Sequence, residues 1–317
     1  MNTLRLTANG LEFAVLEQSA AAATFHGKPQ VQAQVKAPAR TALLLHGFPD
    51  TARTWSHQIG PLSEAGWNVA APFLRGYPPS TVPDAKSLGV HFDKATLVQD
   101  MVELIRALQA RNGSDEPVDL VAQDWGAIIG YALLAAHPEL IGRAVLMAVP
   151  HPVIVSRSLL QPHHVHRSFH WWFFQLPELP EQALAADDQA FIDYLWRYWT
   201  TPGFDDAEHL RHVKETLARP GVLAATLGYY RALFDAQRGD PTLGELRARM
   251  ARPITVPTLA LCGEDDLRAE LMRQQAPLFE GEYRYEEVPK AGHFLHRERP
   301  EAVTALVMDW LKQGAPN

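Results

Sequence analysis

The stretch that decides the fold is Val121-Ala122-Gln123-Asp124-Trp125-Gly126-Ala127, at the end of an apolar run that begins at Val118. The run stops at Asp124, and the small residues Ala122 and Gly126 stand two positions before and after it. This pattern is typical of a sharp strand-to-helix turn, whose central residue is strained and projects above the carboxyl edge of a sheet. A carboxylate there attacks saturated carbon without first losing a proton, and it leaves an ester that water must later break.

Composition narrows the classes of protein that this chain can represent. With 317 residues, 47% hydrophobic and 21% charged, it can form one large domain or a core with an insertion. A net charge of -7 argues against nucleic acid as a partner. Cys262 is the single cysteine, so no intramolecular disulfide forms and a reducing compartment is indicated. No apolar run reaches the roughly eighteen residues of a membrane span, and no signal peptide is evident. We expect a soluble cytoplasmic protein.

Short apolar runs alternate with helical patterns along much of the chain. Strands are expected at residues 11–16, 41–45, 69–71, 118–122, 144–149, 257–262 and 283–288, and helices at 96–109, 128–136 and 300–311. An Ala- and Gln-rich stretch, residues 19–39, is expected to form a loose hairpin excursion. The alternation predicts an α/β fold with a mostly parallel sheet covered by helices on both faces.

One region breaks the alternation. Residues 151–250 are rich in Trp, Tyr, Phe, His and Pro, and they show helical patches without a clear strand. Sheet-forming sequence resumes at Thr255. We therefore expect a core made of residues 1–150 and 251–317, with residues 151–250 inserted as a helical cap over the carboxyl edge of the sheet.

The segment His46-Gly47-Phe48-Pro49-Asp50 directly follows the strand expected at residues 41–45. Its backbone is therefore expected beside the turn at Asp124. The backbone N–H groups of Phe48 and Trp125 are predicted to converge on an oxygen that becomes negatively charged during the reaction, as an oxyanion hole.

Two later loops supply an acid and a base. Leu261-Cys262-Gly263-Glu264-Asp265-Asp266 follows one strand, and Asp266 is interpreted as the orienting acid, while its two acidic neighbours face water. The alternative is a solvated turn or a helix cap. In Pro289-Lys290-Ala291-Gly292-His293-Phe294, His293 is placed as a general base should be. The order Asp124, Asp266, His293 matches nucleophile, acid and base.

From about Thr41 to Leu311 the chain resembles the α/β-hydrolases, and within them the epoxide hydrolases. The segments that carry the resemblance are His46-Gly47-Phe48-Pro49, Arg75-Gly76-Tyr77, Gln123-Asp124-Trp125-Gly126-Ala127, Tyr229-Tyr230-Arg231 and Gly292-His293-Phe294. The resemblance implies that Asp124 opens the epoxide ring and that His293, oriented by Asp266, activates water to hydrolyse the ester. The expected partners are a small apolar epoxide and water, with no cofactor.

The same resemblance implies two hydrogen-bond donors from the cap, usually both tyrosines. Tyr230, followed by Arg231, matches the second donor. The position of the first, before Phe173-Phe174-Gln175-Leu176-Pro177, aligns with His170, or with Trp171 if the alignment slips by one residue. Some bacterial relatives are similar in pairing histidine with tyrosine. An imidazole supplies an N–H in either protonation state, so His170 would serve as a donor at neutral pH.

Other features are given ordinary structural interpretations. His163-His164-Val165-His166 looks like a metal-binding tract, but it lacks carboxylates or cysteines at ligand spacing and is expected on a cap loop, so no metal is predicted. Arg75 is interpreted as a structural charge near the cleft rim, and Asp100 as an acid on a helix face. His296 is a weaker candidate base, expected at a charged helix entrance.

Two other functions stay open at this point. A haloalkane dehalogenase also uses an aspartate followed by tryptophan, and there the Trp125 indole would bind halide beside a second donor, commonly an asparagine where this chain has Phe48. The tyrosine pair at Tyr229 and Tyr230 favours oxygen over halide as the leaving atom. A catalytically silent small-molecule receptor is the third alternative, although a binder has no need of the base. The epoxide's identity and the oligomeric state are left open.

Overall fold

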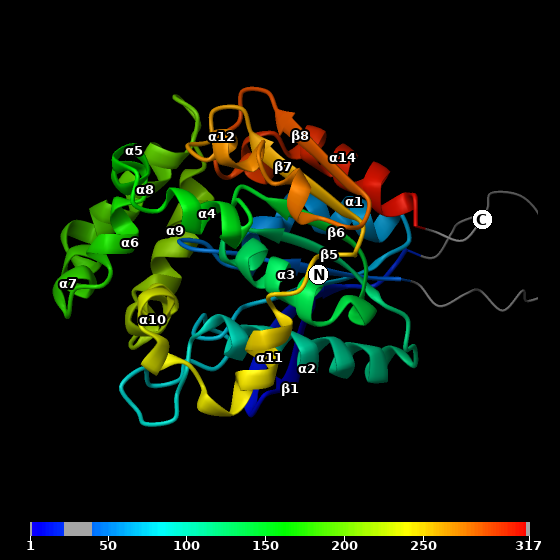
Figure 1. Cartoon of the computed structure of the whole chain (residues 1–317), viewed down its shortest axis with the longest axis horizontal. Helices are drawn as coiled ribbons and strands as arrows, with labels where there is room; N and C mark the ends of the chain where they lie inside the picture. Colours follow the sequence, from blue (N-terminus) through cyan, green and yellow to red (C-terminus); the bar gives the residue numbers. More distant parts are fainter. Residues whose placement is uncertain (1, 22–39, 315–317) are drawn as a thin grey trace, which may run out of the picture.

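The computed structural model describes residues 2–21 and 40–314, and its centre is one eight-stranded sheet with the order β1-β2-β4-β3-β5-β6-β7-β8 (Figure 1). Residues 22–39 of the expected hairpin lie outside the described residues. The strands are β1 (Asn2–Ala8), β2 (Leu11–Gln18), β3 (Thr41–Leu45), β4 (Asn68–Pro72), β5 (Val118–Gln123), β6 (Ile141–Met147), β7 (Thr258–Gly263) and β8 (Tyr283–Val288).

The strands from β3 to β8 pair in parallel, and their carboxyl ends meet at one edge of the sheet. All six residues of β5 are buried, as expected for a strand covered on both faces. The strand expected at residues 144–149 begins earlier and ends earlier, because Ala148 turns into a positive φ of 63°. The sheet therefore brings the loops that follow β3, β5, β7 and β8 to the same edge, with β6 between β5 and β7.

Strand β1 was not expected from the sequence. It pairs antiparallel with β2 across a tight turn in which Asn9 has φ 45° and Gly10 has φ 72°. An Asn-Gly pair supplies the two positive φ values that such a hairpin needs. This edge hairpin pairs with β4 and lies away from the loops that follow β5, β7 and β8.

Helices cover both faces of the sheet. α2 and α3 pack together on one face, and α1, α13 and α14 pack together on the other. The helices of this core are α1 (Ser56–Glu64), α2 (Lys94–Asn112), α3 (Trp125–Ala136), α12 (Ala269–Met272), α13 (Leu295–Glu298) and α14 (Pro300–Lys312). Helix α3 begins directly after Asp124, three residues before the predicted start, so the turn at Asp124 has no intervening loop.

Between β6 and β7 the chain forms a series of helices, to the left of and below the sheet in Figure 1. They are α4 (Pro152–Ser158), α5 (Pro162–Arg167), α6 (Phe169–Phe173), α7 (Leu179–Ala185), α8 (Ala190–Trp199), α9 (Ala207–Leu217), α10 (Val222–Phe234) and α11 (Gly244–Arg249). We call residues 151–250 the inserted segment. The histidine tract expected on a loop is helical in α5, where Pro162 occupies the first turn, a position that suits proline.

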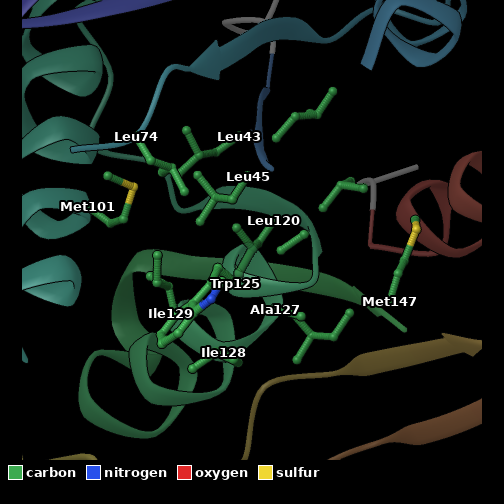
Figure 2. Close-up of a cluster of buried hydrophobic side chains, with 14 of the residues drawn as sticks. Leu43, Leu45, Leu74, Met101, Leu120, Trp125, Ala127, Ile128, Ile129 and Met147 are labelled. Atoms are coloured by element: carbon green, nitrogen blue, oxygen red, sulfur yellow. The ribbon is translucent and has the colours of Figure 1, made fainter. Parts of the chain in front are cut away.

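A buried apolar cluster lies between the sheet and the helices α2 and α3 (Figure 2). Leu43 and Leu45 come from β3, Met101 from α2, and Trp125 and Ile129 from α3, and all five are almost fully buried. Full burial of one such side chain contributes about 1.5–3 kcal/mol to stability. Because Trp125 belongs to this cluster and directly follows Asp124, tight packing holds the turn in place.

Candidate active site

Asp124 occupies a strained turn between β5 and α3, with φ 52° and ψ -121°. The neighbouring backbone approaches so closely that two glycines have no room for a side chain. A Cβ on Gly47 would lie 2.2 Å from Asp124 Oδ1, and a Cβ on Gly126 would lie 2.2 Å from the carbonyl oxygen of Leu45. The small residues in the sequence are therefore required by close contact, and the geometry presents the carboxylate above the edge of the sheet.

The two oxygens of the Asp124 carboxylate have different surroundings. The backbone N–H of Phe48 donates to Oδ1 over 2.7 Å. Oδ2 lies 3.4 Å from Nε2 of His293. Within residues 2–21 and 40–314, no hydrogen bond joins the backbone N–H of Trp125 to this carboxylate, although that N–H belongs to the first residue of α3. Oδ1 is thus held by the loop after β3, while Oδ2 faces the imidazole.

Asp266 and His293 stand on the loops that follow β7 and β8. His293 Nδ1 lies 3.0 Å from Asp266 Oδ2, within hydrogen-bond distance. The other oxygen of Asp266 accepts the backbone N–H of Arg268 over 2.7 Å, which fixes the carboxylate. Asp266 is buried, whereas Glu264 and Asp265 are exposed. The three residues singled out in the sequence are therefore adjacent in space.

The ionisation of His293 depends on both carboxylates. Burial by itself would lower the pKa of His293, but its contacts with Asp124 and Asp266 outweigh burial and raise the pKa to about 9. The imidazole is therefore protonated at neutral pH. Nε2 is buried and has no hydrogen bond of ordinary geometry with the described residues, and its ion-pair neighbour is Oδ2 of Asp124, 3.4 Å away.

The loop that carries His293 is tied to both parts of the molecule. The backbone N–H of His293 donates to the carbonyl oxygen of Trp199, at the end of α8, over 2.8 Å. Gln123 Nε2, at the end of β5, donates to the carbonyl oxygen of His293 over 3.2 Å. Buried Glu298 accepts the backbone N–H groups of Gly292 and Thr201, at 3.0 and 2.8 Å. These bonds fix the imidazole relative to β5 and to the inserted segment.

His170 on α6 and Tyr230 on α10 face the same cavity as Asp124, with ring centroids 5.8 Å apart. Burial, with repulsion from the positive charges of Arg268 and His293, lowers the pKa of His170 well below 6.5, so this imidazole is neutral. Burial and the negative charge of Asp124 raise the pKa of Tyr230 well above 10.0, so the phenol keeps its proton. Both side chains are neutral and can donate hydrogen bonds at neutral pH.

The neighbour Tyr229 has a different role. Its hydroxyl donates to the carbonyl oxygen of Arg75 over 2.7 Å, below the site. The guanidinium of Arg75 is itself buried against Asp100, with contacts of 2.7 and 2.5 Å. Arg75 is therefore a structural charge as expected, but it is buried and not at a rim. Asp100 lies on α2 as expected, and the two form a buried ion pair because each neutralises the other away from water.

The cavity over Asp124 is small, about 20 Å³, which is room for about one water molecule. It is lined by Asp124, Trp125, Ile128, Val149, Arg167, His170, Trp171, Trp199, Tyr230, Asp266, Leu267, Arg268 and His293. Trp171, the alternative in the alignment, lines the cavity too. A group much larger than water would therefore need side chains to move before it could occupy this cavity.

An apolar pocket of about 130 Å³ adjoins this cavity. The two share Ile128, Val149 and Trp171. The rest of the pocket is lined by Lys94, Pro150, Pro152, Val155, Ser156, Leu159, Leu233 and Phe234. It therefore offers an apolar surface next to the reacting centre, mostly from the first helices of the inserted segment.

Two residues near the site differ from expectation. His296, expected at a charged helix entrance, is fully buried and contacts Thr54 Oγ1 at 2.6 Å, because α13 packs against α1 and α14. Arg268 was not singled out in the sequence, yet it lines the cavity. Nothing in the sequence distinguishes it from the other arginines, since only the fold brings it to the site.

Two further observations concern the described part of the chain alone. It contains no group of three or more His, Cys, Asp or Glu side chains arranged to hold a metal ion. None of its helices is both long enough and apolar enough to cross a membrane.

Comparison with known proteins gives a family and two kinds of relatives. Residues 42–306 match the model of the alpha/beta hydrolase family. The AB hydrolase superfamily protein YfhM of Bacillus subtilis is 30% identical over 274 residues, 85% of this chain and 89% of that protein. Epoxide hydrolase 3 of Xenopus tropicalis is 31% identical over 282 residues, 86% and 71% of the two chains. The crystal structure of Epoxide Hydrolase A from Mycobacterium thermoresistibile has a TM-score of 0.75 and 24% identity, and 98% of each chain is covered.

A dehalogenase is also similar. Fluoroacetate dehalogenase of a Burkholderia species is 27% identical over 284 residues, 86% of this chain and 87% of that protein. The sheet order, the flanking helices and these similarities together confirm the predicted fold class and the resemblance to epoxide hydrolases. The chain therefore belongs to the α/β-hydrolase family.

Proposed function

We propose that this protein is an epoxide hydrolase, which converts an apolar epoxide to a vicinal diol through an ester on Asp124. The observation that carries the proposal is the meeting of two kinds of group in one cavity: the carboxylate of Asp124 beside His293, and the neutral donors His170 and Tyr230. Several similar proteins are named epoxide hydrolases, which supports the same substrate class.

The first half-reaction forms the ester. Oδ2 of Asp124 attacks a ring carbon, because Oδ1 is already bonded to the N–H of Phe48. As the new C–O bond forms, the ring C–O bond breaks and its electron pair stays on the epoxide oxygen. Tyr230 or His170 donates a hydrogen bond and then a proton to that oxygen, and the donor regains its proton from water. The product is a hydroxyalkyl ester of Asp124.

The second half-reaction breaks the ester. Formation of the ester removes the negative charge of Asp124, one of the two charges that raise the pKa of His293. The pKa of the imidazole then falls, so the imidazolium releases its Nε2 proton to the hydroxide left when the cap donor was reprotonated by water. The neutral Nε2 can then take a proton from a second water molecule. The hydroxide adds to the ester carbonyl, and the N–H groups of Phe48 and Trp125 stabilise the resulting oxyanion. Collapse of this intermediate releases the diol and restores the carboxylate, while Asp266 keeps the imidazole oriented.

The inserted segment, residues 151–250, would act as the cap of this enzyme. It supplies His170 from α6 and Tyr230 from α10, and most of the apolar pocket beside the cavity. An apolar arm of the epoxide would lie in that pocket, since burying apolar surface favours binding. The core, residues 1–150 and 251–317, would supply the nucleophile, the base and the acid.

Haloalkane dehalogenation is the second candidate, because Asp124, Asp266 and His293 would serve it equally and one relative is named a dehalogenase. A panel of styrene oxide, epoxyhexane, bromobutane and fluoroacetate distinguishes the two, with diol and halide measured separately. We expect diol from the epoxides and little halide. Halide release without diol would overturn the epoxide proposal, and binding without turnover of any compound would favour a receptor.

A matched pair of variants sharpens this test. In a dehalogenase the indole N–H of Trp125 holds the halide, so Trp125→Phe would stop turnover while Tyr230→Phe would be tolerated. In an epoxide hydrolase Tyr230→Phe is the more damaging change, because the leaving oxygen needs a donor. The turnover rate of Trp125→Phe divided by that of Tyr230→Phe, measured on the same substrate, decides between the mechanisms.

A further inference from the structure

Arg268 is a positive charge at the reacting centre that the proposed mechanism does not use. It lies two residues after Asp266, and it lines the cavity together with Asp124, His293 and Tyr230. Its guanidinium Nη2 donates to Ser168 Oγ over 2.9 Å, and its Cζ lies 4.8 Å from the centre of the Trp171 ring. The side chain is therefore held by one hydroxyl and one aromatic face.

The other arginines with little exposed surface all have a carboxylate. Arg75 pairs with Asp100 at 2.5 Å, Arg143 with Glu282 at 2.8 Å, and Arg297 with Asp206 at 2.6 Å. In the described ranges Arg268 has no carboxylate within 4.0 Å. Arg268 is partly buried, and the charges of Asp266 and Asp124 act on it from beyond that distance. Partial burial without a paired carboxylate still removes hydration from a cation, which is costly.

Support of Asp266 does not account for the Arg268 side chain. The bond from this residue to Asp266 Oδ1 uses the backbone N–H, which any residue except proline supplies. The guanidinium has five N–H donors in a planar fork, and one hydrogen bond to Ser168 leaves most of them available. Such a fork matches the two oxygens of a carboxylate.

A second arginine stands on the same wall of the cavity. Arg167 donates from Nη1 to the carbonyl oxygen of Leu267 over 3.2 Å, and it lies 3.6 Å from the exposed Glu270. Arg167, Arg268 and the protonated His293 line the cavity together with two carboxylates, Asp124 and Asp266, so positive charge is in excess there although the whole chain has a net charge of -7. This concentration attracts an anionic group to the site.

We propose that Arg268 binds a carboxylate of the substrate, so that the preferred substrate is an otherwise apolar epoxide whose ring carbon, or its neighbour, bears a carboxylate. The inference rests on the proposed epoxide hydrolase function and narrows its substrate class. A short separation between ring and carboxylate is required, because Arg268 and Asp124 line the same cavity of about 20 Å³. The guanidinium also offsets the repulsion between the substrate's carboxylate and Asp124.

The test compares two epoxides of equal shape, trans-phenylglycidate and trans-phenylglycidamide, which differ in charge. We expect wild-type protein to prefer the acid in kcat/KM. Arg268→Gln should lower kcat/KM for the acid by at least about 30-fold, the usual loss when one partner of a buried charged pair is removed. The same change should alter the amide by less than about 3-fold, since the amide never used the charge. Arg268→Lys, which keeps the charge without the fork, should fall between.

Arg273→Gln is the matched control, because Arg273 ends α12 outside the cavity, pairs with Glu287 and carries the same charge. It should leave the ratio of acid to amide unchanged. A role of Arg268 in positioning Asp266 or His170 would instead lower kcat on both substrates equally. Equal losses on acid and amide would overturn the inference while leaving the hydrolase function intact.

Binding of unreactive ligands separates this inference from the proposed function. Calorimetric titration with phenylpropanoate and phenylpropanamide needs no turnover. We expect the acid to bind more tightly than the amide to wild-type protein, and that preference should disappear in Arg268→Gln. If acid and amide bind equally to wild type, the anion site is refuted. Selective binding of the acid without diol from any epoxide would instead refute the hydrolase proposal and keep the anion site.

Discussion

The two halves of the site differ in charge and in how their side chains are held. The core half, Asp124, Asp266 and His293, consists of two acids and a protonated imidazole, stands on loops after parallel strands, and is linked by contacts of 3.0 and 3.4 Å. The half from the inserted segment, His170 and Tyr230, is neutral and packed among aromatic rings. Nδ1 of His170 has no hydrogen-bond partner within the described residues.

This difference suggests that the two halves act in different steps of the proposed reaction. A charged nucleophile and base need fixed partners, because ionised groups are costly to bury alone. Donors to a leaving oxygen need the opposite, since they must stay uncharged and keep a proton available until the oxygen becomes negative. Under the proposed function, ester formation uses both halves, whereas ester hydrolysis uses the core half alone. The predictions below test that separation.

The largest effect is expected from Asp124→Ala. Without the carboxylate no ester can form, so turnover should fall by at least about 10⁴-fold. Circular dichroism should show an unchanged fold, because removing a strained side chain at the turn does not disturb the apolar cluster beneath it.

The oxygen source gives an independent check on wild-type protein. In a single turnover in isotopically labelled water, the oxygen added to the diol should come from Asp124 and be unlabelled. Diol labelled from solvent in that first turnover would contradict the covalent mechanism.

His293→Gln should separate the two half-reactions. The carboxylate of Asp124 still attacks, but no base activates water, so the ester should accumulate and appear in intact-protein mass spectra as an adduct of the substrate's mass. Asp266→Asn should slow the same step less completely. His212→Gln, at a partly exposed histidine that contacts Glu215, serves as control and should show no adduct. Loss of ring opening without an adduct in His293→Gln would contradict the assigned role.

Tyr230→Phe and His170→Phe should each slow ester formation by about 10²- to 10³-fold, as for the loss of one oxyanion donor, and leave ester hydrolysis much less affected. The double variant should nearly stop the first step. Tyr229→Phe is a matched control, since it also removes a buried hydroxyl, here one bonded to Arg75. It should cost about 1 kcal/mol of stability without slowing ester formation. Rapid-quench kinetics resolves the two steps. Equal slowing of both steps would contradict the assignment of His170 and Tyr230 to ester formation alone.

The smallest effect concerns the ionisation of His293. Because the Asp124 carboxylate helps to raise the pKa of His293 to about 9, Asp124→Asn should lower that pKa, as followed by NMR of the imidazole. The raised pKa also stabilises the folded state below the unfolded value of about 6.5, and this contribution is lost as pH rises through about 9. The variant should therefore lose less stability between these two pH values. An unchanged imidazole pKa would show that Asp124 does not act on His293.

The sequence predicted the parts of the core half that depend on strand order. Apolar runs located β3, β5 and β7, and small residues around Asp124 indicated the turn, because close backbone contact leaves few alternatives. Strand β1 was missed because its residues alternate between exposed and partly buried positions at a sheet edge.

Features that depend on the packing of distant segments could not be predicted from the sequence. The position of the Arg268 guanidinium is set by contacts with Ser168 and Trp171, which are about a hundred residues earlier in the chain. His296 looked like part of a charged surface segment, but packing of α13 buried it. The resemblance to epoxide hydrolases pointed to His170, and the structure places this residue in the cavity, while its role remains a prediction.

The bond from the backbone N–H of His293 to the carbonyl oxygen of Trp199 has a consequence for the timing of the catalytic cycle. A movement that lifts the end of α8 away from the core would break this bond and remove one of the contacts that hold the loop of the base. Under the proposed function, opening on that side would therefore lower the precision of the base. Exchange of substrate and diol on the side of the apolar pocket would leave this bond intact.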